Sequence, residues 1–331
     1  MKTASRMRRA LVTGATGFIG RRLVDRLVAG GVEVVAFQRS GGHFFPATVE
    51  SVQGDVCRED QVAAACARVD VVFHLAALVT FDPRRRDELV RVNGGGTAAV
   101  LAAAMRAGVK RCVVAGSAAT LGVSWAARFP RHEDASPPPE QVARNPYMES
   151  KLACERAAFD CPPRMPVVVV NPTTVFGPGD RTLNSGTLFR QVTTWPVLPV
   201  PPGGTNAVDV DDVVDGLVAA ASRGTPGRRH VLAGQDLTFA EVISTIARVT
   251  GRIPVMVPVP AAARLPFEAA ARVASAVSGG RFLTPQIVGD LFGFKHFACE
   301  RARRDLGWYP RYSFADSAAR AWEWYRREGL L

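Results

Sequence analysis

The sequence predicts an α/β fold, a doubly wound parallel sheet followed by a smaller, mixed α/β C-terminal lobe. Two observations predict the sheet. Short runs that are apolar throughout alternate with helical segments in the first half of the chain, and a glycine-rich turn joins the first run to the first helix. Strands that are apolar on both faces need helices on both sides, which is the doubly wound arrangement. A second lobe is predicted because a stretch rich in Pro, Gly and Thr replaces this alternation after Pro172.

Each element of the first half follows from composition and spacing. The predicted strands are apolar, often rich in valine, and are bounded by glycine or polar residues; they are 9–13, 32–37, 49–55, 69–77, 111–117 and 167–172. Helices are expected between strands where apolar residues recur at helical spacing, over 20–31, 60–69 and 97–108. Right-handed crossovers through such helices make the strands parallel.

The second half returns to regular structure after the Pro-rich stretch. Residues 206–223 predict a short strand and then a helix that starts near Asp211 or Asp212, with acidic residues at its positive end. Another strand is expected in 228–234. The resulting division is 1–172 plus about 207–233 for a nucleotide-binding domain, and about 173–206 plus 234–331 for a substrate-binding lobe.

The rest of the predicted lobe is apolar. A helix is expected over 237–251, with Thr238 as N-cap and Glu241 three residues later, the pattern of a capping box. The segment 254–277 that follows is strongly apolar. These residues can form the core of the lobe, or they can line a pocket for an apolar ligand.

Charge alone does not define a partner. The 331 residues include 41 Lys and Arg against 30 Asp and Glu, a formal net charge of +11 that favours anionic partners such as nucleotides, nucleic acid or lipid. The basic residues occur in short groups along the chain and not in one tail. No nucleic-acid recognition motif accompanies them, so we expect no nucleic-acid partner.

The cysteines and the N-terminus predict a reduced, cytoplasmic protein. The six cysteines form no CxxC pair and have no histidine cluster beside them, which argues against a metal site and against a disulfide scaffold. The start MKTASRMRRA is basic, but the apolar run after it is interrupted by glycines and too short for a signal peptide. No run of 18 apolar residues exists, so no transmembrane helix is expected, although a peripheral membrane contact remains possible.

The first motif with chemical meaning is TGATGFIG, residues 13–20. Gly14, Gly17 and Gly20 lie between the first predicted strand and the first helix. Glycines allow a tight turn and let the backbone approach a pyrophosphate, whose charge is favoured at the helix N-terminus. The motif in this position predicts a dinucleotide site.

Polar residues follow the other predicted strands. Asp55 ends the third strand and could accept a hydrogen bond from an adenine amino group. His74 ends the fourth strand, and Asn93 precedes the next helix, where it could also be a simple N-cap. Ser117 follows the fifth strand, at the carboxyl edge where ligands bind to such sheets.

The stretch NPYMESK places Tyr147 and Lys151 four residues apart, on one face of a helix if a helix forms there. Such a pair arises by chance only about 0.05 times in a chain of this composition. Lysine is also rare here, since almost all basic residues are arginine and lysine occurs only at 2, 110, 151 and 295. The pair is therefore a candidate for function.

Together these motifs resemble the extended short-chain dehydrogenase/reductases. TGATGFIG, GDV, HLAA, VN…GT, GSAAT, YMESK and NPTTVFGPGD occur in that family's order, and VDVDDVVDGL and RRDLGWYP extend the resemblance over nearly the whole chain. The resemblance implies a Rossmann-like sheet, a nicotinamide cofactor and an enzyme. It implies the catalytic residues Ser117, Tyr147 and Lys151, with Asn93 in a supporting role.

The resemblance also implies which residues hold the cofactor. They are Gly14, Thr16, Gly17, Phe18, Ile19, Gly20, Gln38, Arg39, Ser40, Asp55, Val56, His74, Ala76, Ala77, Tyr147, Lys151, Pro172 and Thr173. NAD-binding members of such folds usually have an acidic residue at the end of the second strand, where this chain has Gln38 followed by Arg39 and Ser40. We therefore expect NADP(H) to be preferred, with NAD(H) as the alternative.

The chemistry expected of this site is hydride transfer coupled to proton transfer. A lysine ammonium close to the phenol favours its ionised form, as acid/base work near neutral pH requires. Ser117 would orient the reacting oxygen, and Lys151 would also hold the nicotinamide ribose. Dehydratases of the family usually carry Asp-Glu after the catalytic Thr, whereas Ala118-Ala119 follow Ser117 here, so dehydration is disfavoured.

Within the family, the chain resembles the 3β-hydroxysteroid dehydrogenase and dihydroflavonol reductase-like branch. Its apolar segment 254–277 resembles the steroid-dehydrogenase and alkanoate-reductase branches and also hopanoid-associated epimerase-like proteins, and we expect a ketone or secondary alcohol of an apolar substrate. One alternative is a nucleotide-sugar epimerase with tightly bound NAD, in which Arg190 and Asn184 could hold the diphosphate. Another is a non-catalytic NADP-sensing regulator, a type that usually lacks the Tyr or Lys. Relatives commonly dimerise through the helices expected over 94–107 and 147–160, so a homodimer is predicted.

Overall fold

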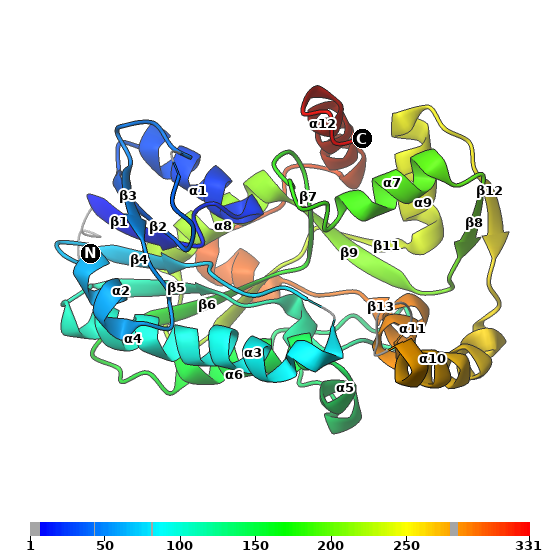
Figure 1. Ribbon diagram of the computed structural model, residues 1–331, viewed down its shortest axis with the longest axis horizontal. Helices are drawn as coiled ribbons and strands as arrows, with labels where there is room; N and C mark the ends of the chain where they lie inside the picture. The colour runs from blue at the N-terminus through cyan, green and yellow to red at the C-terminus, as the bar shows by residue number, and fades with distance from the viewer. Residues whose placement is uncertain (1–6, 43, 81, 279–283) are drawn as a thin grey trace.

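The computed structural model describes residues 7–42, 44–80, 82–278 and 284–331. Part of the basic start, residues 1–6, lies outside this description. A large parallel sheet dominates the first lobe, with strand order β10-β6-β5-β4-β1-β2-β3 (Figure 1). Its strands are β1 (Arg9–Thr13), β2 (Glu33–Gln38), β3 (Glu50–Gln53), β4 (Val71–His74), β5 (Arg111–Ala115), β6 (Val167–Pro172) and β10 (Arg229–Leu232). The predicted Rossmann-like doubly wound sheet is confirmed, and its order reverses between β1 and β4.

Helices cover both faces of this sheet (Figure 1). One face carries α1 (Phe18–Ala29) and α8 (Val210–Arg223), and the other carries α2 (Glu59–Ala65), α4 (Gly96–Arg106) and α6 (Pro146–Phe159). Strand β1 shows why both layers are needed. Ala10 and Val12 pack in the core with α1 and α8, while Leu11 packs in the core on the opposite face, and all three are fully buried.

Three predicted strands are longer than the observed ones. The ladder ends at Gln53, His74 and Ala115, whereas 49–55, 69–77 and 111–117 were expected. Small and apolar residues continue past each strand because they line the carboxyl edge of the sheet, so composition does not mark where pairing stops. The helix expected over 60–69 ends at Ala65, since Cys66 closes it and Arg68 takes a left-handed backbone angle of φ 59°.

The second lobe is built on a smaller sheet and a two-stranded ribbon. The sheet contains β7 (Thr174–Phe176), β9 (Gly204–Asp209), β11 (Gln235–Thr238) and β13 (Phe294–Lys295), and the ribbon pairs β8 (Val197–Val200) with β12 (Val255–Pro258). The helices are α7 (Gly186–Thr194), α9 (Phe239–Thr250), α10 (Arg264–Ser278), α11 (Pro285–Phe292) and α12 (Phe314–Arg327). The expected capping box of α9 is confirmed, because Thr238 and Glu241 bond to each other's backbone N–H. Short helices α3 (Arg86–Leu89) and α5 (Pro139–Arg144) complete the fold.

The end of the NPTTVFGPGD motif anchors the second lobe. The carboxylate of Asp180 is fully buried and accepts the backbone N–H groups of Asn184, Ser185 and Gly186 at 3.0–3.1 Å. It also accepts the hydroxyl of Tyr325 from α12 at 3.2 Å. Burial and the nearby Asp180 charge raise the pKa of Tyr325, so this phenol stays a neutral donor. One carboxylate thus caps the start of α7 and fastens α12 to it.

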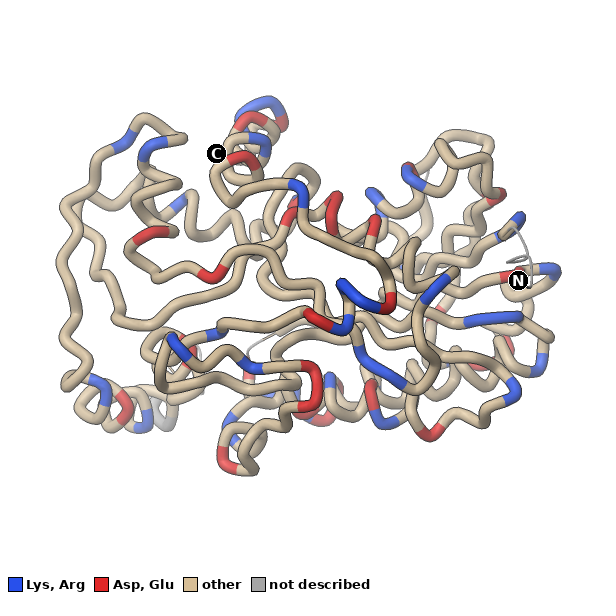
Figure 2. Tube along the Cα trace, turned by 180° about the vertical axis from the view of Figure 1, so that it is seen from behind, with Lys and Arg blue, Asp and Glu red and all other residues tan. Residues whose placement is uncertain are grey.

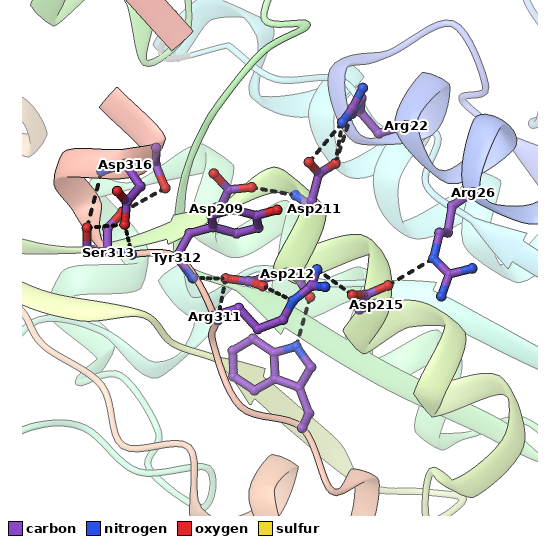
Figure 3. Close-up of polar contacts among 12 residues, drawn as sticks. Arg22, Arg26, Asp209, Asp211, Asp212, Asp215, Arg311, Tyr312, Ser313 and Asp316 are labelled. Atoms are coloured by element: carbon purple, nitrogen blue, oxygen red, sulfur yellow. Dashed lines mark hydrogen bonds and ion pairs between the residues drawn. The ribbon is translucent and has the colours of Figure 1, made fainter. Parts of the chain in front are cut away.

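A second set of carboxylates, at the start of α8, joins the lobes (Figure 3). The side chain of Asp211 accepts both Nε and Nη2 of Arg22 from α1, at 2.7–2.9 Å. Arg320 of α12 reaches Asp209 at 2.9 Å and also contacts Asp211. Asp209 itself caps α8 by accepting the backbone N–H of Asp211 at 2.8 Å. Helices from both lobes therefore share these two carboxylates.

The neighbouring carboxylate of Asp212 holds the segment before α12 (Figure 3). It is almost fully buried and accepts the backbone N–H groups of Arg311 and Tyr312 at 2.9 and 3.1 Å, as well as Nε of Arg311 at 3.1 Å. The indole of Trp308 donates to the Asp212 carbonyl at 2.8 Å. The two motifs VDVDDVVDGL and RRDLGWYP, far apart in sequence, are thus direct partners.

The structure also answers the sequence-based expectations about charge and cysteines. Figure 2 shows the Lys and Arg of the described residues in short pieces scattered along the trace. No helix within the described ranges is both long and apolar enough to cross a membrane. In the same residues His, Cys, Asp and Glu do not form a group suited to a metal ion. The six cysteines are free thiols.

The Asp212 contacts predict a large stability effect. Asp212→Ala removes the acceptor of two part-buried backbone N–H groups and one of the two carboxylate partners of Arg311, which we expect to cost about 2–4 kcal/mol in the free energy of unfolding. Asp215→Ala on the same helix is the control. Its partly exposed carboxylate pairs with Arg26 and Arg311, so a loss below about 1 kcal/mol is expected. Urea unfolding measures both, and equal losses would contradict the assignment.

Candidate active site

The glycine turn after β1 is as tight as its sequence suggests. Gly14 has φ 68°, and a Cβ there would lie 2.7 Å from the backbone nitrogen of Ala76. A Cβ on Gly20 would lie 2.1 Å from the carbonyl oxygen of Gly14. Gly17 immediately precedes α1, which has no side-chain cap and no acidic residue in its first turn. The free N–H groups of that turn fit a pyrophosphate.

Thr16, Phe18 and Ile19 of this motif make different contacts. The carbonyl of Thr16 accepts Nε of Arg21 at 3.1 Å. Phe18 lies beside Gly179, whose Cβ would be 3.5 Å from its ring, and Ile19 packs against the core under α1. Ile19 therefore serves packing, and the Thr16 carbonyl is bonded to Arg21 in the first turn of α1.

The end of β2 offers an acceptor without a partner. The side chain of Gln38 is buried, and its Nε2 donates to the Gly42 carbonyl at 3.2 Å. Its Oε1 is buried and has no hydrogen-bond partner. Arg39 and Ser40 beside it are exposed. An unpaired buried acceptor next to an exposed guanidinium and hydroxyl fits the ribose end of a dinucleotide.

The end of β3 turns back toward the sheet. Asp55 is exposed, and its Oδ1 accepts the backbone N–H of Cys57 at 2.9 Å. The backbone N–H of Asp55 donates to Gln61 at 2.8 Å. Val56 is buried against the start of α4, where a Cβ on Gly96 would lie 3.1 Å away. The carboxylate of Asp55 keeps one oxygen free of the turn.

His74 is buried inside the sheet edge, with both ring nitrogens bonded. Thr97 donates to the Asn93 carbonyl at 2.6 Å, so its oxygen accepts Nε2–H of His74 at 3.0 Å. Nδ1 of His74 then accepts the hydroxyl of Thr13 at 2.8 Å, and that oxygen accepts the N–H of Ala76 at 3.3 Å. Burial, together with the Lys151 charge, lowers the pKa of His74 to about 3. The imidazole is a neutral structural link, and it reaches a ligand only through the loop that it holds.

Asn93 fixes the same loop from another side. It lies in a π-helical turn, Val90–Gly95, and its side-chain oxygen accepts the N–H of Leu78 at 2.7 Å. Its amide nitrogen donates to the Leu78 carbonyl at 3.0 Å and to the Ser150 hydroxyl at 2.9 Å. The loop that contains Ala76 and Ala77 is therefore linked through Asn93 to Ser150 of α6, the residue before Lys151. The simple N-cap interpretation of Asn93 is wrong.

Ser117, Tyr147 and Lys151 meet at the carboxyl edge of β5. Ser117 is extended, and its Oγ accepts the N–H of Ala119 at 3.2 Å. Tyr147 and Lys151 lie one turn apart on α6, whose start is capped by Asn145 through the N–H of Met148 at 2.9 Å. Lys151 is buried, and its Nζ donates to the Ala115 carbonyl at 2.9 Å.

A buried polar cluster around Glu155 lies next to this edge of the sheet. Glu155 lies one turn after Lys151 and accepts the hydroxyl of Thr120 at 2.7 Å and the amide of Asn171 at 2.6 Å. Its other oxygen accepts Nη1 of Arg229 at 3.1 Å. Thr120 belongs to the turn that Ser117 opens, so the cluster joins this turn to α6, β6 and β10. Glu155 was not expected from the sequence, although it continues the spacing of Tyr147 and Lys151.

A cavity of about 160 Å³ opens beside Ser117 and Tyr147. It is lined by Ser117, Ala118, Ala119, Gly122, Val123, Asn145, Tyr147, Met148, Pro172, Thr173, Thr174, Gln286, Asp290, Lys295 and Phe297. Pro172 and Thr173 at the end of β6 are thus next to the predicted catalytic residues. The four lining residues after position 280 come from the second lobe, so the cavity exists only between the lobes.

Sequence reasoning missed the second-lobe side of this cavity. Asp290 pairs with Lys295 at 3.5 Å, and Nε2 of the buried Gln286 has no partner. The rarity of lysine was a usable signal for Lys295, since Lys151 stood out for the same reason. No signal in the sequence marked Gln286 or Phe297. The suggested Arg190 and Asn184 do not line this cavity.

This fold and site define an NAD(P)-binding oxidoreductase of the extended short-chain type, and comparison with known proteins agrees. The profile of the NAD dependent epimerase/dehydratase family matches residues 10–234, and the chain belongs to this family. Sterol demethylase protein B of Methylococcus capsulatus is 28% identical, over 97% of this chain and 99% of that protein. A 3 beta-hydroxysteroid dehydrogenase/Delta 5→4-isomerase of Mycobacterium tuberculosis is 28% identical, over 92% and 87%.

Solved structures with the same architecture are also similar over their whole length. The crystal structure of gox2253 superposes with a TM-score of 0.84 at 25% identity, covering 97% of this chain and 99% of that one. MoeE5 in complex with UDP-glucuronic acid and NAD superposes with a TM-score of 0.76 at 27% identity, with the same coverage. The chain is therefore an enzyme, an oxidoreductase of a family that depends on NAD(P).

The buried His74 predicts a pH-dependent stability. Its pKa is about 3 in the folded protein against an ordinary 6.5, so the unfolded chain binds the extra proton between these values and stability falls as the pH drops. Between about pH 7 and pH 5, wild type should lose about 2 kcal/mol more than His74→Asn. Denaturant unfolding at both pH values measures this. The exposed His132→Asn should behave as wild type, and a His74→Asn slope equal to wild type would refute the argument.

Proposed function

We propose that this enzyme interconverts a ketone and a secondary alcohol on an apolar substrate, with NADP(H) as preferred cofactor. The observation that carries the proposal is the lining of the cavity beside Ser117 and Tyr147. Among the described residues that line it there is no arginine, and its one cation, Lys295, already pairs with Asp290. Val123, Met148 and Phe297 supply apolar walls.

The relatives support the same class of substrate. The proteins named sterol demethylase protein B and 3 beta-hydroxysteroid dehydrogenase match this chain over more than nine-tenths of its length. Steroids are large apolar molecules that carry a reacting oxygen on a ring carbon. A cavity with apolar walls and a hydroxyl at one end suits such a substrate.

The proposed chemistry uses the three residues in distinct roles. A bound nicotinamide supplies or accepts the hydride. The Ser117 hydroxyl donates a hydrogen bond to the substrate oxygen and fixes its position, and Tyr147 gives the proton to that oxygen or takes it. The Lys151 ammonium has three N–H donors, of which one bonds to the Ala115 carbonyl. The ribose hydroxyls of the cofactor would accept the other two.

A nucleotide-sugar epimerase is the second candidate, because MoeE5 was solved with UDP-glucuronic acid and NAD. A diphosphate needs cationic partners, and the cavity lining offers only Lys295. An NADP-sensing regulator is disfavoured, since Ser117, Tyr147 and Lys151 are all present and adjacent. Release of stoichiometric NAD⁺ on denaturation, together with turnover of UDP-glucose, would favour the epimerase.

The role of Tyr147 is tested by Tyr147→Phe. We expect kcat for reduction of a steroid ketone to fall about 10²- to 10⁴-fold, because the proton donor is lost, while NADPH affinity stays nearly unchanged. Lys151→Met should lower both turnover and NADPH affinity. Steady-state kinetics and cofactor titration measure the two effects. A Tyr147→Phe enzyme that keeps more than about a tenth of wild-type turnover would rule out the assignment.

Cofactor preference is tested at Arg39. Charge-assisted bonds of about 1.5–3 kcal/mol to the 2′-phosphate predict a preference for NADPH over NADH on the order of ten- to a hundredfold in kcat/KM. Arg39→Ala should remove most of it. Arg106→Ala, an exposed arginine paired with Glu59 at the end of α4, is the control and should change nothing. Equal use of both cofactors by wild type would show that Arg39 does not bind the phosphate.

A further inference from the structure

The second lobe contains a cavity that the proposed reaction does not use. It encloses about 260 Å³ between α7, the ribbon β8–β12, α9, α10 and α11. Aliphatic, proline and aromatic side chains form nearly all of its wall, and none of the described residues that line it carries a charge. Its volume is close to the lower end of the range, about 300–1,000 Å³, that is usual for ligand pockets. A hydrocarbon group is the ligand that such a wall accepts without leaving polar groups unpaired.

Helix α11 separates this cavity from the active site. Gln286 and Asp290, four residues apart, line the cavity beside Tyr147. Val288, Leu291 and Phe292 line the apolar cavity from other faces of the helix. The two cavities have no lining residue in common, so the apolar cavity is a separate site.

The apolar cavity lies beside an exposed apolar surface. Trp195 and Phe267 line the cavity, and yet each is nearly half exposed. Next to them, the outer side of the ribbon carries Val197, Val255 and Val257, all exposed, with Val255 directly opposite Val197 in the ladder. An exposed ribbon face normally carries polar residues. This one is apolar on the outside as well as on the side that faces the core.

The exposed apolar side chains are concentrated at this end of the molecule. Fourteen large apolar side chains are exposed among the described residues, and eight of them lie here: Trp195, Val197, Ile253, Val255, Val257, Leu265, Phe267 and Val273. We call these eight residues the apolar end face. In Figure 2 the trace through the ribbon strands is free of charged residues. Apolar patches of this kind mark interaction sites.

Arginines flank the apolar end face. The segments 186–201 and 248–278 contain Arg190, Arg248, Arg252, Arg264 and Arg272, but only one acidic residue. That residue, Glu268, is nearly buried and lies 3.9 Å from both Arg264 and Arg272. Apolar side chains with arginine around them match the interface of an anionic bilayer, where the apolar groups enter the acyl region and the arginines meet phosphates.

From this combination we infer that the apolar end face docks on anionic membranes and that the adjoining cavity takes a hydrocarbon chain from a lipid there. A second copy of this chain is a poorer occupant, because a twofold contact would bring the same arginines together. The inference does not depend on the reaction catalysed. It adds a membrane-binding surface and a lipid site to the enzyme.

Vesicle co-sedimentation of the full chain tests the docking. Vesicles in which about a quarter of the phosphatidylcholine is replaced by phosphatidylglycerol should bind wild type about tenfold more strongly than pure phosphatidylcholine, and high salt should weaken the binding. The double variant Val255→Ser/Val257→Ser should lose about tenfold in partitioning. Both valines are exposed, so the fold should tolerate the change. Tyr309→Ser, also exposed but outside the apolar end face, is the control and should bind as wild type.

The cavity is tested with the fluorescent fatty acid cis-parinaric acid. Val259→Phe narrows the apolar cavity and should abolish binding, whereas the exposed Leu265→Phe and the active-site variant Met148→Phe should not. If only Met148→Phe abolishes binding of cis-parinaric acid, the hydrocarbon chain of this fatty acid enters the cavity beside Tyr147 and the inference is wrong. Absence of vesicle binding would also contradict the inference. If in addition light scattering shows a wild-type dimer and a monomeric Val255→Ser/Val257→Ser variant, the apolar end face binds a second copy of the chain and not a membrane.

Discussion

The carboxylates at the start of α8 are the contacts on which the rest of the structure depends. Asp211 and Asp212 bind α1 of the first lobe and the segment before α12 of the second, through charged and backbone donors. Carboxylates that accept several charged and backbone donors at once, as these two do, tolerate little displacement, because a shift leaves a charge or an N–H group unpaired. The cavity beside Ser117 and Tyr147 is formed by side chains of both lobes. The shape of this cavity therefore depends on the ion pairs of Asp211 and Asp212, which do not line the cavity.

Helix α6 applies the same principle inside the active site. Tyr147, Lys151 and Glu155 recur every four residues, so they share one face of the helix. The lower two are held by buried partners, Lys151 by the end of β5 and Glu155 by a cluster that reaches β10. In the proposed reaction, a phenol on a helix face held in this way would need little reorganisation, and preorganised polar groups are a main source of catalysis in enzymes.

The second lobe combines two surfaces of opposite character around one short helix. Gln286 and Asp290 of α11 line the cavity beside Tyr147, and the apolar residues of the same helix line the cavity next to the proposed membrane surface. An enzyme acting on an apolar substrate must take that substrate from a phase in which it dissolves. The proposed membrane surface and the cavity beside Tyr147 lie in or at the same lobe, so the two proposals are compatible with each other.

The sequence by itself determined what depends on near neighbours. Alternating apolar strands and helices predicted the parallel sheet, the glycine spacing predicted the turn after β1, and the interval between Tyr147 and Lys151 placed them on one helical face, because these features follow from backbone periods of two and 3.6 residues. Tertiary structure decided the rest. Gln286 and Lys295 line the same cavity as Tyr147 although they lie more than a hundred residues away in sequence, and the side chains of His74 and Asn93 are buried links between elements. Such contacts depend on how the lobes pack, which no local pattern encodes.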